Sequence, residues 1–188
     1  MNLAVISQNF PTAKFDEATQ SLVVPHIDLL NVVDFIKNNS EFGMDYVSNV
    51  TGVDWLPKKE KVKAADGTET EVDKPGYLEV VYHFYSMKNR TGPIVLRCRT
   101  DGREHTIVPS ITPLFRGAEF QEREIFDLYG VQFPGHPDLR RILMWDEFKD
   151  FPMRKDYKEP DDYEWEPTPH DEVLEKARQH YPADAPQK

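Results

Sequence analysis

Cysteine is nearly absent from this sequence. Cys98 is the single cysteine among 188 residues, so the chain cannot form an internal disulfide. An iron–sulfur cluster or zinc site held by the chain's own thiolates needs several cysteines and is excluded as well. Cys98 lies in the stretch IVLRCR, which is typical of a strand. We therefore expect a buried, small apolar residue there rather than a reactive thiol.

Positive charge is also scarce. Asp and Glu number 33 against 23 Lys and Arg, which gives a formal net charge of −10. Residues 121–188 contribute −7 of this, from seventeen acidic and ten basic side chains. Nucleic acids and anionic lipid surfaces both require a basic face. The charge balance therefore argues against either as a partner.

Long apolar runs are missing too. No stretch approaches the ~18 apolar residues of a membrane span. The N-terminal residues MNLAVISQNF lack the basic start and the apolar run of a secretory signal. We expect a protein of cytoplasmic origin that meets a membrane only through a partner.

The apolar residues that are present predict an α+β fold. Helical spacing of Ile27, Leu30, Val33 and Ile36 predicts an amphipathic helix. A second helix is expected over 111–129. Alternating β-branched and aromatic residues predict strands at 42–56, 77–87 and 92–100, and either a strand or a helix entry at 21–25. This order favours a small, mainly antiparallel sheet with helices on one face.

The chain divides by composition into two parts. We expect an α+β domain over 1–130, in which the charged stretch 58–76 is a solvent-exposed insertion loop or hairpin. From Pro134 onward there are eight prolines in 55 residues, together with many large apolar side chains. This mixture favours an extended C-terminal segment over 131–188 that wraps a partner, with a short helix near its end.

Catalytic motifs are lacking, but a charged motif is present. The sequence has no HExxH pattern, no glycine-rich phosphate loop and no nucleophile beside its charged residues. It does have EREIFDLYG, a helix-like run that ends at Gly130. Arg123 and Asp127 are four residues apart, which predicts a weak pair on one helical face. Glu122 and Glu124 are two apart and point in different directions.

Two interpretations of this run remain open at the level of residues. A stand-alone acid/base enzyme would use Glu122, Glu124 and His136. His136 lies between Gly135 and Pro137, where a histidine more often makes a fixed hydrogen bond. The other interpretation is a surface that clamps a neighbouring protein.

Basic residues continue the motif toward the C-terminus. Arg140 and Arg141, then Arg154 and Lys155, could hold an anionic ligand or pair with the carboxylates of a partner. Their acidic neighbours in the sequence are Asp138 and Asp156. Mixed signs at this density favour a protein interface over a phosphate site.

Three motifs now point to a known family. EREIFDLYG, GHPDLRRIL and PMRKDY, in this order, resemble the signature of the thirty-kilodalton subunit of the respiratory NADH:quinone oxidoreductase, complex I. VTGVDW, VVYHFYS and PSITPLF are similar as well, so the resemblance covers roughly residues 22–160. Phe115 and Phe120 stand where tryptophan is common in the family, which keeps an aromatic ring at both positions.

The resemblance implies a scaffold within a large assembly. Such a protein lies in the peripheral arm, on the cytoplasmic side of the inner membrane, and packs against the hydrogenase-like subunit of the quinone site and the cluster-binding subunits. It binds no cofactor, while the assembly uses iron–sulfur clusters, quinone, FMN and NADH. Related ferredoxin-dependent complexes and membrane-bound hydrogenases use similar subunits, so the electron donor stays open.

The resemblance also implies which residues face the partner. They come from the three motifs, and most of them are charged residues or glycines that turn the chain. They are Glu122, Arg123, Glu124, Asp127, Gly130, Gly135, His136, Asp138, Arg140, Arg141, Arg154, Lys155, Asp156 and Tyr157.

Overall fold

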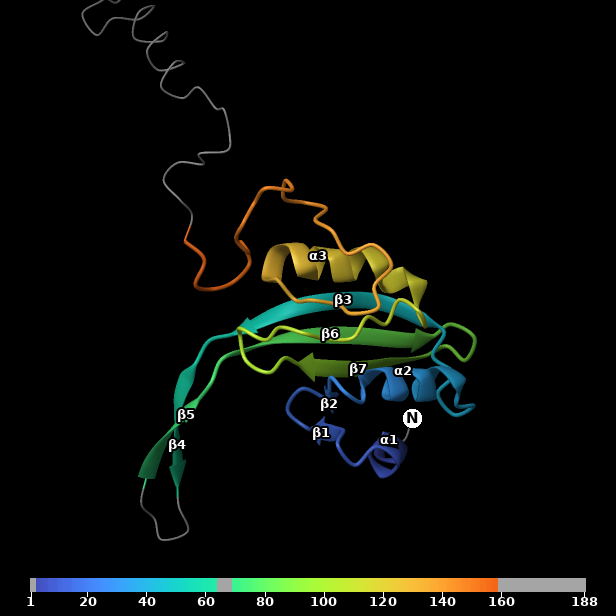
Figure 1. Ribbon diagram of the computed structural model, residues 1–188. Coiled ribbons are helices and arrows are strands. Elements are labelled where there is room, and N and C mark those ends of the chain that lie inside the picture. The colour runs from blue at the N-terminus through green and yellow to red at the C-terminus, as the bar shows by residue number, and fades with distance from the viewer. Residues whose placement is uncertain (1–2, 64–68, 159–188) are drawn as a thin grey trace, which may run out of the picture. The chain divides into compact units, whose positions relative to one another are not determined.

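The computed structural model describes residues 3–63 and 69–158 and centres on a five-stranded sheet (Figure 1). Its strands, in the spatial order β1-β2-β7-β6-β3, are β1 (Lys14–Asp16), β2 (Ser21–Pro25), β3 (Tyr46–Trp55), β6 (Tyr77–Ser86) and β7 (Thr91–Arg99). Only the β2–β7 pair is parallel; β1–β2, β3–β6 and β6–β7 are antiparallel. The prediction of a mainly antiparallel sheet is confirmed.

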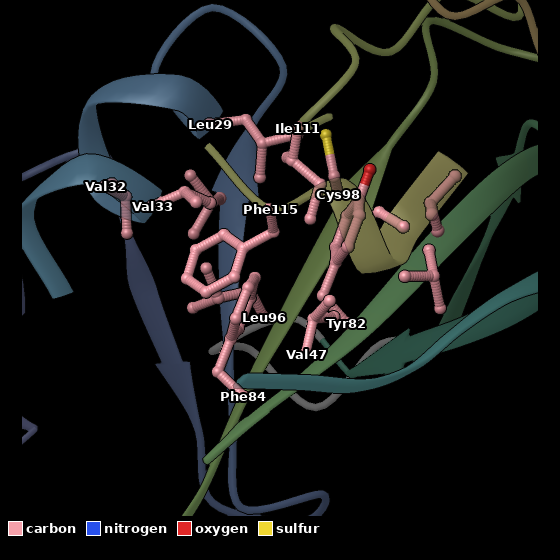
Figure 2. Packing of buried hydrophobic residues seen from close by; sticks show 14 of the residues in the cluster. Leu29, Val32, Val33, Val47, Tyr82, Phe84, Leu96, Cys98, Ile111 and Phe115 are labelled. Atoms are coloured by element: carbon pink, nitrogen blue, oxygen red, sulfur yellow. The ribbon is translucent and has the colours of Figure 1, made fainter. Parts of the chain in front are cut away.

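One face of this sheet carries the core. Alternate side chains of β6, from Leu78 to Phe84, are fully buried there, as the two-residue period of a strand requires. The helices α1 (Ala4–Asn9), α2 (Leu29–Asn38) and α3 (Glu119–Tyr129) contribute side chains to the same apolar cluster, as does the short 3₁₀ helix η1 (Arg116–Ala118). Figure 2 shows Tyr82, Phe84 and Leu96 from the sheet facing Leu29, Val33 and Phe115.

Cys98 lies in this core. It is fully buried on β7, and burial raises the pKa of its thiol to about 12. The expectation of a small apolar residue is confirmed.

The first predicted helix exists, but of its four predicted core positions only Val33 and Ile36 are buried, while Ile27 and Leu30 are exposed. A turn in which the Asp28 N–H bonds the carbonyl of Pro25 delays the start of α2 to Leu29. The buried residues are Leu29, Val32, Val33 and Ile36, which follow the i, i+3, i+4, i+7 pattern. Ile27 precedes the helix and is 71% exposed.

The second predicted helix is shorter than expected. Residues 111–115 form a turn in which the N–H groups of Leu114 and Phe115 both bond the carbonyl of Ile111. Phe115 is extended, and the regular helix begins only at Glu119, after η1. Ile111 and Phe115 still enter the core, so their apolar spacing was a sign of burial rather than of a continuous helix.

α3 packs on the edge strand β3. The side chain of Gln121 accepts a hydrogen bond from the Val50 N–H at 2.6 Å, on the edge of β3 that no strand of the described residues pairs with. A Cβ atom at Gly52 would lie 2.7 Å from the Tyr129 ring, so the close approach requires glycine there. α3 therefore covers the edge of β3 and satisfies one of its unpaired N–H groups.

The compact part of the chain extends beyond the predicted boundary at residue 130. A bridge between Ile107 and Gln132 and bonds from Ser110 to Pro134 and from Gln132 to Thr106 tie 131–134 to 106–110. The compact unit covers Met1–Tyr157. Residues 131–157 thus belong to the domain, and the predicted terminal helix lies outside the described residues.

The charged stretch forms a hairpin that projects from one end of the sheet (Figure 1). Its strands are β4 (Lys58–Lys63) and β5 (Glu69–Lys74), which pair antiparallel. Of the two forms predicted for this stretch, a loop or a hairpin, the structure has the hairpin. None of the helices in 3–63 and 69–158 is long and apolar enough to cross a membrane.

Candidate functional site

The three motifs meet at the C-terminal end of α3. Asp127 is fully buried, and its Oδ2 atom accepts N–H bonds from Ile142, Leu143 and Met144 at 3.0, 2.6 and 2.9 Å. Its Oδ1 atom accepts a bond from Arg141 at 2.7 Å. Burial by itself would raise the pKa of Asp127, but these hydrogen bonds outweigh it and hold the pKa below its usual value.

The segment after the helix also satisfies the last carbonyl groups of α3. The final four carbonyls of a helix have no partner within it and must be satisfied by other groups. The Phe126 carbonyl binds the Gly130 N–H, and the Asp127 carbonyl binds Arg141. The remaining two, of Leu128 and Tyr129, bind the Met153 N–H and the Arg154 guanidinium.

Arg141 and Arg154 also place positive charge at the C-terminal end of α3, where cations complement the negative pole of the helix dipole. We call Asp127, Gly130, Arg141, Phe151 and Arg154, with the bonds above, the α3 clasp.

One aromatic ring fills the centre of the α3 clasp. The guanidinium groups of Arg141 and Arg154 both lie over the Phe151 ring, at 5.4 and 4.7 Å from its centroid. It also packs on Gly130, where an added Cβ would lie 2.5 Å from the ring. Gly130 has φ +76, a conformation that side chains other than glycine rarely adopt. This glycine is therefore required for both the turn and the contact.

A second set of bonds holds the end of the segment. Arg103 donates two bonds to Asp156, at 3.0 and 2.6 Å, and one to the buried Asp54 at 2.7 Å. The same Asp54 oxygen accepts the Lys155 N–H at 2.8 Å. The bonds with Asp156 raise the pKa of Arg103 and lower that of Asp156. The Tyr157 N–H bonds the Arg154 carbonyl.

The predicted pair between Arg123 and Asp127 is wrong. Arg123 instead donates to the carbonyls of Arg140 and Arg141 at 3.2 and 3.4 Å, and its guanidinium is 3.5 Å from Asp138. Both members of the expected pair turn toward the segment that follows the helix. There they satisfy buried polar groups, which is worth more than a surface pair.

His136 makes the fixed hydrogen bonds that its Gly-His-Pro setting suggested. Its Nε2 atom lies 3.0 Å from the Glu119 carbonyl, and its Nδ1 atom accepts the Asp138 N–H at 3.1 Å. This arrangement requires the proton on Nε2. The imidazole thus links the first turn of α3 to the loop at Gly135.

Glu122 is a buried carboxyl group on the core side of α3. It accepts bonds from the Ser110 hydroxyl at 2.5 Å and from the Ile111 N–H at 2.8 Å. Burial raises its pKa to about 7, against the lowering effect of these two bonds. Burial, and to a smaller degree the charge of Glu122, also raises the pKa of the Tyr82 phenol. Glu122 therefore fixes the 110–112 turn to the helix.

The structure does not bring the predicted acid/base residues together. Glu122 faces the core, Glu124 is exposed, and His136 is held by the backbone groups of Glu119 and Asp138. Among residues 3–63 and 69–158, no group of His, Cys, Asp and Glu has a geometry suited to a metal ion.

Sequence reasoning missed Phe151, Arg103 and Asp54. Asp54 is part of VTGVDW, and that motif was the only signal in the sequence that could have drawn attention to it. The contacts of Arg103 with Asp54 and Asp156 are not visible from spacing alone.

Large apolar side chains of α3 and of the segment that follows it remain exposed. They are Phe120 (64%), Ile142 (36%), Leu143 (61%) and Met153 (52%). Phe120 lies under the Arg123 guanidinium at 5.5 Å, and Leu143 and Met153 are held to α3 by their own N–H groups. Arg140 and Asp138, which precede Ile142 in the sequence, form an exposed ion pair. We call these four side chains the α3 apolar surface.

Comparison with known proteins gives the family. The profile of the family described as respiratory-chain NADH dehydrogenase, 30 Kd subunit, matches residues 22–163. The chain belongs to this family. The prediction made from the three motifs is confirmed.

Two bacterial relatives illustrate the match. The chain is 37% identical over 152 residues to a subunit of NADH-quinone oxidoreductase from Moorella thermoacetica, an alignment that covers 79% of this chain and 88% of that protein. It is 36% identical over 137 residues to a subunit of NADH-quinone oxidoreductase from Rhizobium meliloti, which covers 73% of this chain and 65% of that protein.

Two solved structures share the fold. A chain from the membrane-bound sulfane sulfur reductase, an archaeal respiratory membrane complex, aligns with a TM-score of 0.61 at 18% identity, over 99% of this chain and 92% of that one. A trypsin-resistant fragment of Nqo5 aligns with a TM-score of 0.52 at 22% identity, over 74% of this chain and the whole fragment.

We predict that Asp127→Asn destabilises the domain by about 3–5 kcal/mol. It removes one partner of a buried ion pair and places an amide N–H₂ among four donors. Urea unfolding of the purified chain measures the change, and limited proteolysis should show cleavage within 140–153. Glu124→Gln, an exposed carboxylate on the same helix, is the control and should change stability by less than about 0.5 kcal/mol. Equal stability of the two variants would contradict the central role of Asp127.

Glu122→Gln tests the buried carboxyl. Because the folded-state pKa of Glu122 is about 7 against an ordinary value of 4.5, the native state holds this proton more tightly than the unfolded state. The resulting stability is fully present below pH 4.5 and is lost as the pH rises through 7, by up to ~3 kcal/mol. Glutamine can still accept the Ile111 N–H through its oxygen and can donate to the Ser110 hydroxyl through its amide nitrogen, and it cannot ionise.

As the pH rises, the native chain should therefore lose stability relative to Glu122→Gln. Urea unfolding from roughly pH 4 to pH 8 measures this difference. Glu124→Gln should give a curve parallel to that of the native chain. A difference that stays constant over this range would show that Glu122 ionises normally.

Proposed function

We propose that this chain is a non-catalytic, peripheral-arm subunit of a proton-translocating NADH:quinone oxidoreductase. In this role it docks the hydrogenase-like subunit of the quinone site and lies beside the cluster-binding subunits. Its membership in the thirty-kilodalton subunit family supports the assembly. Electron transfer from NADH to quinone would belong to the assembled complex, with the iron–sulfur clusters, FMN and quinone bound by other chains.

The α3 apolar surface is the observation that supports the proposed docking role. Large side chains such as Leu143 and Met153 are exposed although the backbone beneath them is held by the α3 clasp. Exposed apolar groups on a rigid support, with charges such as Arg140 and Asp138 at the margin, are the arrangement of an interface core and rim. Several residues expected at the interface, among them Asp127 and Arg154, would act indirectly by fixing this surface.

The hydrogen-bond arrangement favours a scaffold over an enzyme. A general base must reach a substrate proton. Glu122 is fully buried, and both nitrogens of His136 are engaged with backbone groups. The proposed location is the cytoplasmic side of the inner membrane, with membrane contact through the complex alone.

The docking surface can be tested by a charge placed within it. Leu143→Glu should reduce the amount of assembled complex in detergent-solubilised native membranes about tenfold or more, because one buried carboxylate at an interface costs several kcal/mol. Met87→Glu is the matched control, since Met87 is 66% exposed and Leu143 61%. Met87 lies at the β6–β7 turn, outside the α3 clasp and the α3 apolar surface.

Activity per assembled complex distinguishes the two classes of function. A scaffold predicts that the remaining Leu143→Glu complexes turn over at nearly the native rate. Full assembly with lost turnover would overturn it. The electron-input subunits recovered with a tagged native chain would also show whether NADH or ferredoxin is the donor.

A further inference from the structure

The sheet face opposite the core holds a basic hollow that the α3 clasp does not use. The hollow has a volume of about 470 Å³. Its walls include Trp55, Tyr77 and Arg99 from the sheet and Lys58 and Lys74 from the base of the β4–β5 hairpin. Tyr77 and Arg99 alternate with the buried core residues of their strands, so they face away from the helices.

A buried ion network forms the floor of the hollow. The Glu79 carboxylate is 1% exposed and accepts bonds from Arg97 at 2.6 Å, from Arg99 at 2.9 Å and from the Trp55 indole at 3.0 Å. Arg97 also binds Asp16 at 3.2 Å. These bonds fix the positions of the arginines in advance of any ligand.

Positive charges outnumber negative ones in the hollow. Arg97, Arg99, Lys58 and Lys74 line it, against the carboxylates of Asp16 at its edge and Glu79 beneath. This local excess occurs in a chain whose formal net charge is −10.

The strand register concentrates this charge. Lys58 and Lys74 lie directly opposite each other in the β4–β5 pair. Like charges at such positions repel each other.

Arg99 is positioned to bind a carboxylate. Its guanidinium lies 5.0 Å from the Tyr77 ring centroid and donates to Glu79 through Nε. Within the described part of the chain, the ion pair with Glu79 leaves its two Nη groups available, and its side chain is 41% exposed. A guanidinium held in this way binds a carboxylate through two parallel bonds.

We propose that this hollow binds an acidic segment of a neighbouring subunit. An Asp or Glu side chain of that segment binds Arg99 and Lys58, and an adjacent apolar side chain packs on Trp55 and Leu56. The open hollow lies on the opposite face of the sheet from α3. The segment therefore comes from a contact separate from the one proposed for the α3 apolar surface.

A photocrosslinking amino acid at Leu56 tests the proposal in intact complexes. Leu56 lines the hollow, is 44% exposed and carries no charge. After irradiation of native membranes, mass spectrometry identifies the attached residue. The expected product joins Leu56 to another subunit, within a few residues of at least two Asp or Glu. Attachment to a segment without acidic residues, to lipid only, or to nothing while a probe at Leu143 does react would overturn the proposal.

A charge variant makes the test independent of folding. Lys58→Glu in the probe-bearing chain should reduce the crosslink about tenfold, the effect of losing one charge-assisted contact of about 1.4 kcal/mol. It should leave the unfolding temperature of the chain unchanged or higher, because it places opposite charges across the strand pair. Lys88→Glu, an exposed lysine at the β6–β7 turn, is the control with the same change in net charge.

Two results with these variants would reject the acidic partner. One is equal crosslinking in Lys58→Glu and Lys88→Glu. In the other, an acidic residue of the identified segment is changed to lysine together with Lys58→Glu, and the crosslink is not restored.

Discussion

The carboxylate of Asp127 is the group on which the C-terminal half of the domain depends. A fully buried negative charge is costly unless it is paired and hydrogen-bonded. Here one oxygen accepts three successive backbone N–H groups, and the other accepts Arg141. The constraint acts in both directions, because without Asp127 those three N–H groups would lack their acceptor. Residues 141–144 consequently have one position relative to α3.

The helix end imposes a second constraint on the same segment. All four terminal carbonyls of α3 find donors, most of them from residues that lie more than ten positions beyond the helix. This explains why a segment with so little regular structure can be well packed. Its backbone and arginine groups replace the partners that a further helical turn would have provided. Phe151 then fills the space that Gly130 leaves open.

These constraints support the two proposed contacts in different ways. The α3 clasp holds Leu143 and Met153 in place while their side chains stay exposed, so little conformational entropy would be lost when a partner covers them. On the other face of the sheet, Glu79 orders Arg97 and Arg99 in a similar manner. In both places, a buried carboxylate orders at least one arginine side chain next to an exposed surface.

The sequence by itself determined the α+β class, the family and the burial of Cys98. These follow from local periodicity, residue type and motif order, which the chain carries without reference to its fold. It also indicated the fixed role of His136, because the flanking glycine and proline limit the local backbone.

Tertiary structure decided which side chains meet. The spacing of Arg123 and Asp127 predicted a pair on the helix, yet each binds the segment after Gly130, since buried polar groups there need partners more than an exposed pair does. Tertiary structure also decided where the compact unit ends, which is at residue 157 and not at the predicted residue 130. Long-range bonds such as that between Arg103 and Asp156 join residues 53 positions apart, and no local pattern encodes a contact over that distance.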